Sequence, residues 1–566
     1  MPLGRERFPA GTESGIVRIG RRDMLTALGT AGALLPAAAS PAAAASPERR
    51  SRGADFGPKQ RASGSRGLAI TGHAESTRIA VEVLRQGGNA CDALLAASLA
   101  QTVLQPHLTT VTGCFSLLYR DAATGRSEYL NANVNAPLAP LTGFGPADVF
   151  GGRGVAVPGF WAGIEAAHQA YSSMPLARLI APAIALARDG VECEPFFWGE
   201  LFAAQVAIGA NPAGRRIFMP ARALPPPGGT VRQPEAADLL ERLRDEGSRY
   251  FYHGSFAERF CAIVRQAGGV LTPEDFARYA VRREEPVRGT YRGLDVVAAA
   301  PPDMGGLHLI ETLNIAEQID IARLGPASES PEVLVHLMRA VREVMTAGAA
   351  YGDPRYVPLD RERILSKAFA RERMQAQAPA QAAPVAPPGS CHLTVVDRHG
   401  NIATALHSTL SLPWVNGLFI DGVSICGAAN HFLRTMPPPG ARVSVMICPS
   451  LILREGRPLI ACGSPSTSLI ATLAQNITNI VDCGMDIAES VRRATFGGLA
   501  DADGRMTIEA DIGDALLAAV AGAGIQAEKL NPWSFRNGSF EGIFFDPHGT
   551  AHACGDPRRT SVAMAV

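Results

Sequence analysis

The sequence has 566 residues, of which 47% are hydrophobic and 19% are charged, a composition typical of globular proteins that excludes a disordered chain. Lysine plus arginine and aspartate plus glutamate number 53 each, so no net charge favours a nucleic acid or a cation as partner. Since single cores stop growing near roughly 250 to 300 residues, this length allows one large domain or several ordinary ones.

The first 45 residues have the order of an export signal. Arg21 and Arg22 precede a short apolar run, and small residues continue through Ala45. The run is shorter than the roughly 20 apolar residues that cross a bilayer. We therefore predict a twin-arginine-type signal over residues 1–45, with an extracellular or periplasmic protein that has no membrane contact after export. A leader that does not function would leave the protein in the cytoplasm.

The next segments alternate between strand and helix patterns. Residues 46–66 are polar and rich in Gly, Ser and Arg, which predicts a flexible lead-in. Residues 67–107 predict a strand and then two helices separated by a Gly-Gly-Asn turn. Residues 114–134 predict a hairpin, and the middle of the chain, residues 158–374, is predicted to be mostly helical.

Residues 375–389 are almost entirely Ala, Pro and Gln, which predicts an exposed linker. After the linker, residues 391–410 predict a β-hairpin that turns at His399 to Asn401. Residues 443–464 predict another pair of strands, and residues 468–496 predict a helix. Because strands and helices occur on both sides of the linker, we predict an α/β protein in which the linker interrupts one shared core.

Cysteine spacing gives no metal site. The ten cysteines include no C-x-x-C pair, so we predict buried thiols and no metal. The Gly-Gly runs lack the strand-turn-helix pattern that binds phosphates, so we predict no cofactor. Export permits disulfides, but the sequence does not assign them. The cysteines are Cys91, Cys114, Cys193, Cys261, Cys391, Cys426, Cys448, Cys462, Cys483 and Cys554.

The linker ends in the run Gly389-Ser390-Cys391-His392, directly before a predicted strand. This arrangement suits an autoproteolytic precursor in which Ser390 attacks the preceding carbonyl and becomes a new N-terminus. An α-amino group titrates near roughly 7.7 to 8.0, so it can act as the general base of an N-terminal nucleophile. Taken alone, the pattern favours an ordinary serine in a turn before a strand.

From about Gly67 to Val566 the chain resembles the gamma-glutamyltranspeptidase family of N-terminal-nucleophile hydrolases. The matching stretches follow the family's order and include EVLRQGGNACDALLAASL, VAVPGFWAGIEAA, HLTVVDRHGNIATAL and GDPRRTSVAMA. The resemblance implies a four-layer αββα sandwich. It also implies cleavage into a large subunit, residues 67–389, and a small subunit, residues 390–566, that stay associated.

The family's nucleophilic Thr-Thr-His run corresponds to Ser390, Cys391 and His392. The resemblance therefore implies cleavage between Gly389 and Ser390, with Ser390 as nucleophile. Cys391 would be the nucleophile if cleavage fell one bond later, and an uncut chain is a further alternative. A second family hydroxyl corresponds to Ser408, whose alternative is an ordinary strand serine.

The resemblance also implies further site residues. The family's oxyanion hole is a Gly-Gly pair, and Ser466 and Thr467 occupy those positions, where backbone N–H groups can still act. The family's substrate contacts change most: its arginine corresponds to Asn133, its aspartate to Asn430 and its serine pair to Val445 and Met446.

These changes argue against glutathione as the substrate. Each charge-assisted hydrogen bond is worth roughly 1.5 to 3 kcal/mol, so the loss of the arginine and the aspartate predicts weak recognition of a glutamyl group. The glycine-rich loop of the family is also shortened, to LTTVTGCF after His107. We therefore expect a hydrolase or acyltransferase that acts through an acyl-enzyme on Ser390 and takes a different small-molecule substrate.

Three other functions stay open. They are carbon–carbon bond hydrolysis of the kind used in alkylproline natural-product pathways, ordinary gamma-glutamyl hydrolysis or transfer, and ligand binding without catalysis. His392 and His407 are expected to be structural, and His73 and His107 have no ligand-like spacing with acidic neighbours. The predicted partners are a small-molecule substrate and the two subunits of one precursor, without nucleic acid.

Overall fold

The computed structural model describes residues 56–347, 351–376, 389–499 and 504–566. The predicted export signal and most of the predicted linker lie outside the described residues. Within them, no helix combines the length and the apolar character needed to cross a membrane.

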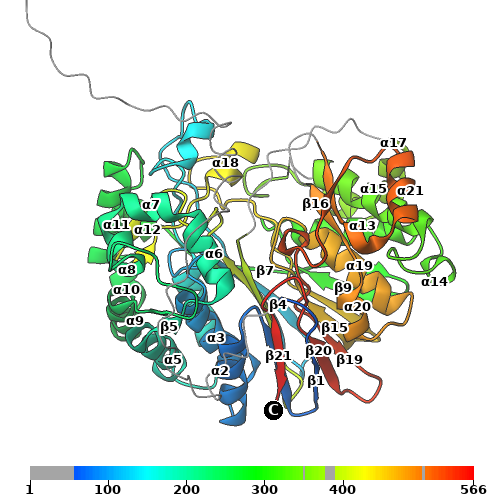
Figure 1. The fold of residues 1–566 in the computed structure, drawn as a ribbon, viewed down its shortest axis with the longest axis horizontal. Helices are drawn as coiled ribbons and strands as arrows, with labels where there is room; N and C mark the ends of the chain where they lie inside the picture. The colour runs from blue at the N-terminus through cyan, green and yellow to red at the C-terminus, as the bar shows by residue number, and fades with distance from the viewer. Residues whose placement is uncertain (1–55, 348–350, 377–388, 500–503) are drawn as a thin grey trace, which may run out of the picture. The chain divides into compact units, whose positions relative to one another are not determined.

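Two antiparallel sheets form the centre of the fold (Figure 1). Within the described residues, the first sheet has the order β21-β2-β10-β11-β3-β4-β7 and the second β1-β20-β19-β15-β14-β9-β8. The strands of the first sheet are β2 (Gly67–Thr71), β3 (Cys114–Arg120), β4 (Ser127–Ala132), β7 (Arg282–Glu284), β10 (Cys391–Asp397), β11 (Ile402–Ser408) and β21 (Val562–Ala565). Those of the second are β1 (Arg61–Gly64), β8 (Val287–Tyr291), β9 (Leu294–Ala298), β14 (Ser450–Arg454), β15 (Arg457–Cys462), β19 (Ile543–Phe545) and β20 (Ala551–Cys554).

Strand alternation explains how the two sheets pack. Along β10, Leu393 and Val395 face the helices that cover the first sheet, whereas Val396 faces the second sheet. Apolar side chains from the inner faces of both sheets pack against one another between the sheets. They include Ile70 and Leu118 of the first sheet and Val297 and Leu451 of the second. Each sheet combines strands from before and after the Gly389–Ser390 bond, so both sides of that bond contribute to both sheets.

A first helical layer covers the outer face of the first sheet. Its helix α3 is buried along its whole length because it lies between the sheet and α5, and a capping box of Asn89 and Asp92 begins it. The layer comprises α2 (Ala74–Arg85), α3 (Ala90–Leu104), α4 (Phe160–Tyr171), α5 (Leu176–Asp189), α6 (Pro195–Ala203), α7 (Gln205–Ala210), α8 (Pro212–Phe218), α9 (Pro234–Glu246), α10 (Ser248–Phe251), α11 (Ser255–Gln266) and α12 (Pro273–Ala277).

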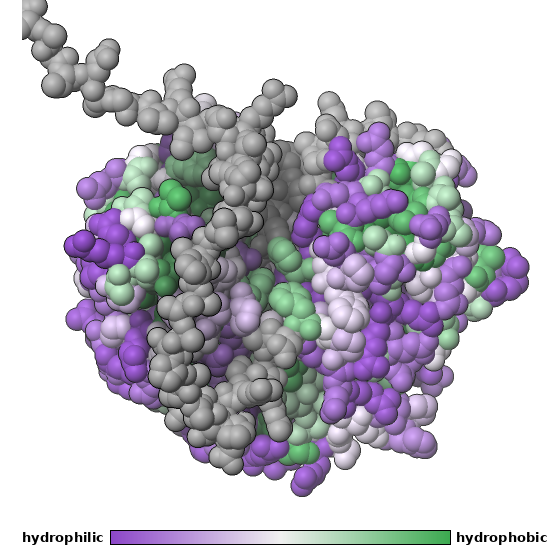
Figure 2. Space-filling model, in the orientation of Figure 1, coloured by the Kyte–Doolittle hydropathy of each residue, from purple (hydrophilic) through white to green (hydrophobic). Residues whose placement is uncertain are grey.

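A second helical layer covers the second sheet, which completes a four-layer αββα sandwich. It comprises α13 (Gly305–Ala316), α14 (Ile321–Leu324), α15 (Pro331–Ala347), α16 (Arg361–Ile364), α17 (Lys367–Ala376), α19 (Leu469–Val481), α20 (Ile487–Arg492) and α21 (Asp514–Gly522). The short helix α18 (Ala429–Arg434) packs near η2 (Pro146–Val149). On the face seen in Figure 2, hydrophilic residues cover most of this second layer, and hydrophobic residues gather in small separate patches.

Small additional strands lie outside the two main sheets. β16 (Phe496–Leu499), β17 (Met506–Glu509) and β18 (Ala527–Leu530) form one small sheet. Two short pairs complete the strands: β5 (Val191–Glu192) with β6 (Thr230–Val231), and β12 (Phe419–Ile420) with β13 (Val423–Ser424). Short 3₁₀ turns occur at η4 (Ala510–Ile512) and η5 (Phe535–Asn537).

The predicted sandwich is confirmed, as are the early strand with its two helices and the hairpins β3–β4 and β10–β11. The prediction for residues 158–374 was incomplete, because the hairpin β8–β9 lies inside this mostly helical region and pairs with β14. The predicted helix over 468–496 is interrupted at Gly484, which has φ +65°, and it restarts at α20 with Asp486 as N-cap. Strand β1 falls within the predicted lead-in.

Candidate active site

The hydroxyls of Ser390 and Ser408 meet at one end of the first sheet. Cys391 pairs with His407 in the β10–β11 register, which places Ser390 beside Ser408 at the end of the hairpin. Their Oγ atoms are 3.0 Å apart. Both hydroxyls also donate to the Gly389 carbonyl oxygen, at 2.8 Å from Ser390 and 2.5 Å from Ser408. The carbonyl of the Gly389–Ser390 peptide is therefore held by the two hydroxyls that the sequence singled out.

Cys391 faces the opposite side of the strand from this hydroxyl pair. Its side chain is buried in the helical layer, and its Sγ lies 3.4 Å from Gln105 Oε1. Burial raises the pKa of the Cys391 thiol far above its ordinary value, with the cation of Arg559 opposing this shift. The thiol is thus kept protonated and packed away from the Gly389 carbonyl.

Arg559 connects the start of β10 with the predicted oxyanion loop. Its Nη1 donates to the Ser390 carbonyl oxygen at 3.2 Å, and its Nη2 donates to the Pro465 carbonyl oxygen at 3.0 Å. Arg559 is buried, and burial lowers the pKa of its guanidinium. A single buried cation therefore contacts both the main chain of Ser390 and the loop that precedes α19.

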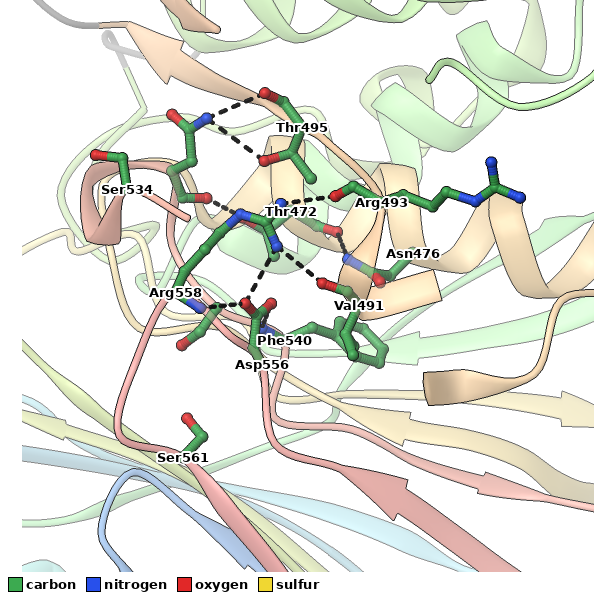
Figure 3. Close-up of polar contacts among 12 residues, drawn as sticks. Thr472, Asn476, Val491, Arg493, Thr495, Ser534, Phe540, Asp556, Arg558 and Ser561 are labelled. Carbon is green, nitrogen blue, oxygen red and sulfur yellow. Dashed lines mark hydrogen bonds and ion pairs between the residues drawn. The ribbon is translucent and has the colours of Figure 1, made fainter. Parts of the chain in front are cut away.

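The neighbouring Arg558 anchors this C-terminal segment (Figure 3). Its guanidinium donates twice to Glu509, at 2.9 and 2.6 Å, and once to Asp556, at 3.2 Å. The remaining N–H groups reach the carbonyl oxygens of Val491 and Arg493. All five donors of a fully buried arginine are thus used, which fixes the turn from which Arg559 extends.

The predicted oxyanion-hole residues lie in the turn before α19. Ser466 is buried, and its Oγ accepts from Ser468 N at 3.0 Å. No hydrogen bond in the described part of the chain occupies the main-chain N–H of Ser466 or Thr467. These two N–H groups are therefore available as donors, although their role in catalysis stays a prediction.

Glu541 places a buried carboxylate near Gly463, just before the turn that leads into α19. Its main-chain N donates to Gly463 O at 3.1 Å, and its Oε1 accepts from Ser539 and Ser561 at 2.7 and 2.5 Å. Burial raises the pKa of Glu541 to about 7, although the two hydroxyls and the nearby Arg559 oppose this shift.

We expect this pKa to be visible in the pH dependence of stability. Glu541 ordinarily titrates at 4.5, so between pH 4.5 and 7 the folded protein holds a proton that the unfolded chain has lost. The stability contributed by this group is complete below pH 4.5 and is lost as the pH rises through 7. From pH 5 to 8, Glu541→Gln should therefore gain about 1 to 3 kcal/mol in unfolding free energy relative to the wild type.

Chemical denaturation at each pH measures this difference. Glu528→Gln is the matched control, because the hydrogen bond from Arg536 lowers the pKa of Glu528 and places its titration below this pH window. Parallel stability curves for wild type and Glu541→Gln between pH 5 and 8 would contradict the assignment.

The predicted substrate residues lie in surroundings of two kinds. Asn133 is fully buried, and its Nδ2 donates to Asp303 at 2.9 Å and to Val443 O at 3.3 Å, while its Oδ1 accepts from Val134 N. Asn430 is half-buried on α18. The substrate role of both residues stays a prediction, and the side-chain donors of Asn133 are occupied within the protein.

Val445 belongs to an apolar cluster that reaches the hydroxyl pair. The cluster includes Leu410, whose main-chain N donates to Ser408 Oγ at 2.9 Å, and Phe432 of α18. Met446 packs against the core on the other side, under the second helical layer. The side chain of Val445 thus lies in an apolar cluster next to Ser408, and a substrate role for Val445 and Met446 stays a prediction.

Buried histidines lie near the site but not on the nucleophile. His407 contacts Thr109 and Gln101, and His392 contacts Thr404. Burial lowers the pKa of each of these two imidazoles to about 3, so both rings are neutral. Their contacts agree with a structural role. Among the described residues, no group of three or more His, Cys, Asp or Glu is arranged to hold a metal ion, and the ten cysteines are free thiols.

A protein-family model described as gamma-glutamyltranspeptidase matches residues 76–566. The chain belongs to the gamma-glutamyltranspeptidase family. It is 30% identical over 549 residues to an acylase ACY 1 proenzyme from Pseudomonas sp. (strain SE83), a match that covers 90% of this chain and 95% of the acylase. It is 26% identical to the glutathione hydrolase proenzyme of Escherichia coli (strain K12), covering 76% and 80%.

Solved structures agree with the fold of this gamma-glutamyltranspeptidase family member. Cephalosporin acylase from Bacillus halodurans superimposes with a TM-score of 0.80 at 21% identity, covering 93% of this chain and 99% of that one. Gamma-glutamyltranspeptidase from Helicobacter pylori gives 0.52 at 28% identity, covering 56% and 93%. The chain is therefore an enzyme of the hydrolase and acyltransferase type that uses an N-terminal nucleophile.

Two contacts of this gamma-glutamyltranspeptidase family site were missed in the sequence. Gln105 reaches Cys391 from 286 residues away, and Arg559 reaches Ser390 from 169 residues away. The only signal for Arg559 is a pair of arginines next to an apolar C-terminal strand, and this pattern does not indicate which of the two arginines faces the nucleophile.

Proposed function

We propose that the chain cuts itself between Gly389 and Ser390, and that the freed Ser390 is the nucleophile of an acylase. The acyl group that it transfers to water does not carry the zwitterionic pair, an α-amino group beside an α-carboxylate, of a gamma-glutamyl substrate. The observation that carries the proposal is the pair of hydroxyls, Ser390 and Ser408, on the carbonyl oxygen of the proposed scissile peptide.

The contacts at Gly389 support the processing step. Ser390 Oγ attacks the Gly389 carbonyl carbon, and the negative charge that develops on its oxygen is met by the Ser408 hydroxyl, already at 2.5 Å. The C–N bond then breaks, the nitrogen takes up the proton that Oγ gave up on attack, and the glycyl group is left as an ester on Oγ. Water hydrolyses that ester, leaving a carboxylate on Gly389 and a free amine on Ser390.

The position of Cys391 supports Ser390 as the new N-terminus. A thiolate is the reactive form of cysteine, and burial keeps the Cys391 thiol protonated on the far side of the strand. Cleavage one bond later would require this side chain to leave the core.

The freed amine of Ser390 acts as the general base. It takes the proton from Ser390 Oγ as Oγ attacks the substrate amide, and it gives that proton to the departing amine. Arg559, which contacts the Ser390 carbonyl oxygen, places a buried positive charge nearby and so disfavours a second charge on the amine. The unoccupied N–H groups of Ser466 and Thr467 are the proposed donors to the oxyanion, and water then releases the acid from the ester.

The surroundings of the former glutamyl contacts support the change of substrate. Asn133 carries no charge and its amide is bonded to Asp303, and Val445 lies in the apolar cluster with Leu410. The acylase relative supports the same change, because it matches a larger share of this chain than the glutathione hydrolase does. An apolar or simply acidic acyl group fits these surroundings better than a zwitterion.

A panel of three anilides tests the substrate. Gamma-glutamyl and glutaryl p-nitroanilide differ only in the α-amino group, and hexanoyl p-nitroanilide carries no charge on its acyl chain. Because two charge-assisted contacts are absent, we expect kcat/KM for the glutamyl anilide to be at least about 100-fold below that of the better of the other two. Release of nitroaniline is followed by absorbance, and Ser390→Ala serves as the blank.

The experiment tests self-cleavage and substrate choice separately, so that one can be wrong while the other holds. If the small fragment begins at Ser390 but the glutamyl anilide is the best substrate, the changed acyl group is wrong and the nucleophile stands. If no fragment forms and no anilide is hydrolysed, the enzymatic proposal itself fails.

A further inference from the structure

A cavity of about 410 Å³ lies away from the nucleophile and carries only positive side-chain charge on its lining. Its charged residues are Arg278, Arg282, Arg283, Arg355 and Arg442, with Tyr356 and Asn135 among the others. No aspartate or glutamate belongs to this lining. We call these five arginines and the space between them the arginine pocket.

The arginine pocket lies at the β7 edge of the first sheet. Arg282 and Arg283 are on β7, and Asn135, just after β4, bridges to Arg442. Four strand spacings separate β10 from β7 in the sheet order. At roughly 4.8 Å for each spacing, the pocket is about 19 Å from the strand that begins at the nucleophile, so it is a separate site.

Arg442 is the buried cation of the pocket. Its exposed fraction is 1%, and its guanidinium donates to the Asn133 and Ala280 carbonyl oxygens and to the Tyr279 hydroxyl. Its Nε has no hydrogen-bond partner, and no carboxylate of the described chain lies within ion-pair distance of its guanidinium. The buried Asp303 interacts with Arg442 through space without forming an ion pair, so an anion in the pocket would supply the direct partner that this buried cation lacks.

Asp353 fixes the pocket from behind. Its carboxylate accepts two hydrogen bonds from Arg282, at 2.9 and 2.8 Å, and one each from the main-chain N of Arg355 and Arg442, at 3.1 and 3.0 Å. Asp353 is itself buried and neutralises Arg282. It therefore holds Arg282, Arg355 and Arg442 in position, and it forms an ion pair with the guanidinium of Arg282 alone.

The outer arginines are free to reorient. Arg283 and Arg355 have side chains that are 57% and 64% exposed, and their nearest carboxylates, on Glu128 and Glu284, are 3.8 and 4.0 Å away. These separations exceed a hydrogen bond, and such exposed pairs contribute little to stability. Arg283 also lies 6.0 Å from the centroid of the Tyr171 ring, a contact that it gives up when it turns toward a ligand, whereas Arg355 turns at little cost.

We propose that the arginine pocket binds a small ligand carrying two or more phosphate or carboxylate groups. One anionic group meets the buried Arg442, and another is held by Arg283 and Arg355 at the rim. The planar guanidinium fork matches either oxyanion in a bidentate manner, which is why arginine and not lysine suits this chemistry.

Calorimetric titration of the purified full-length protein with pyrophosphate and with citrate tests the proposal. We expect at least one of them to bind, and to bind more weakly as salt is raised. The double variant Arg283→Gln/Arg355→Gln should bind it roughly tenfold or more weakly, because it removes two guanidinium groups that form charge-assisted hydrogen bonds with the ligand.

The matched control is Arg249→Gln/Arg323→Gln. These arginines are 79% and 71% exposed and have equally loose carboxylate partners, both at 3.9 Å, so this pair removes the same charge elsewhere on the surface. Unchanged affinity in the control supports the pocket. The proposal is overturned if neither anion binds the wild type, or if the control weakens binding as much as the pocket variant. The measurement is independent of turnover, so it stands apart from the proposed acylase activity.

Discussion

Replacing Ser390 by alanine is expected to leave the chain uncut and inactive. Without Oγ, no atom can attack the Gly389 carbonyl, and the Ser408 hydroxyl on the same oxygen has no tetrahedral intermediate to stabilise. A denaturing gel should show one band for the variant and two for the wild type. Loss of a covalent nucleophile costs about 10⁴-fold or more in turnover, so activity toward the anilide panel should fall to the rate of spontaneous hydrolysis in buffer without protein.

Two companion variants identify the reacting atom. Ser390→Thr keeps a hydroxyl and should still be cut, whereas Cys391→Ala removes only a buried thiol and should be cut at the wild-type position. N-terminal sequencing of the smaller wild-type fragment should start at Ser390. A fragment that starts at Cys391, or two bands from Ser390→Ala, would show that the hydroxyl of Ser390 is not the nucleophile of processing.

Replacing Arg558 by methionine should lower the free energy of unfolding by about 3 to 5 kcal/mol. The variant leaves the buried carboxylates of Glu509 and Asp556 without their cation and frees the turn that carries Arg559. The comparison is made by urea denaturation in the uncut Ser390→Ala background, so that each protein is a single chain.

The control for this prediction is Arg188→Met. Arg188 also contacts two carboxylates, Asp238 and Glu241, but its side chain is 40% exposed and these ion pairs are screened by solvent, so its removal should cost far less than that of Arg558. Equal losses in the two variants would mean that the burial of the Arg558 network adds nothing to its contribution. In an otherwise wild-type chain, Arg558→Met should also slow cleavage, because Arg559 then holds Ser390 less firmly.

The sequence predicted those parts of the site that depend on local pattern. The alternation over 391–410 predicted the β10–β11 hairpin, and a hairpin brings its two ends together, so the meeting of Ser390 with Ser408 follows from its register. The break before α20 could not be placed from helical periodicity alone, since the pattern continues through Gly484.

Contacts that depend on the packing of distant segments could not be predicted. The bond of Asn133 to Asp303 joins residues 170 apart, and it turns a predicted substrate contact into one with occupied donors. The arginine pocket likewise gathers its arginines from three segments of the chain. The overall charge of the chain is balanced and gave no indication of a local excess of positive charge.

The pairing of β21 with β2 has a topological consequence. Val566 N donates to Gly67 O, so the last residue of the chain lies beside the first long strand of the fold. Gly67 and Val566 therefore lie close together, and a cut at 389/390 would create a second pair of chain ends elsewhere in the fold. A circular permutant that starts at Ser390 and runs from Val566 through a short peptide into β1 would preserve every strand pairing. Once its initiator methionine is removed, it would carry the proposed reactive amine of Ser390 without a self-cleavage step.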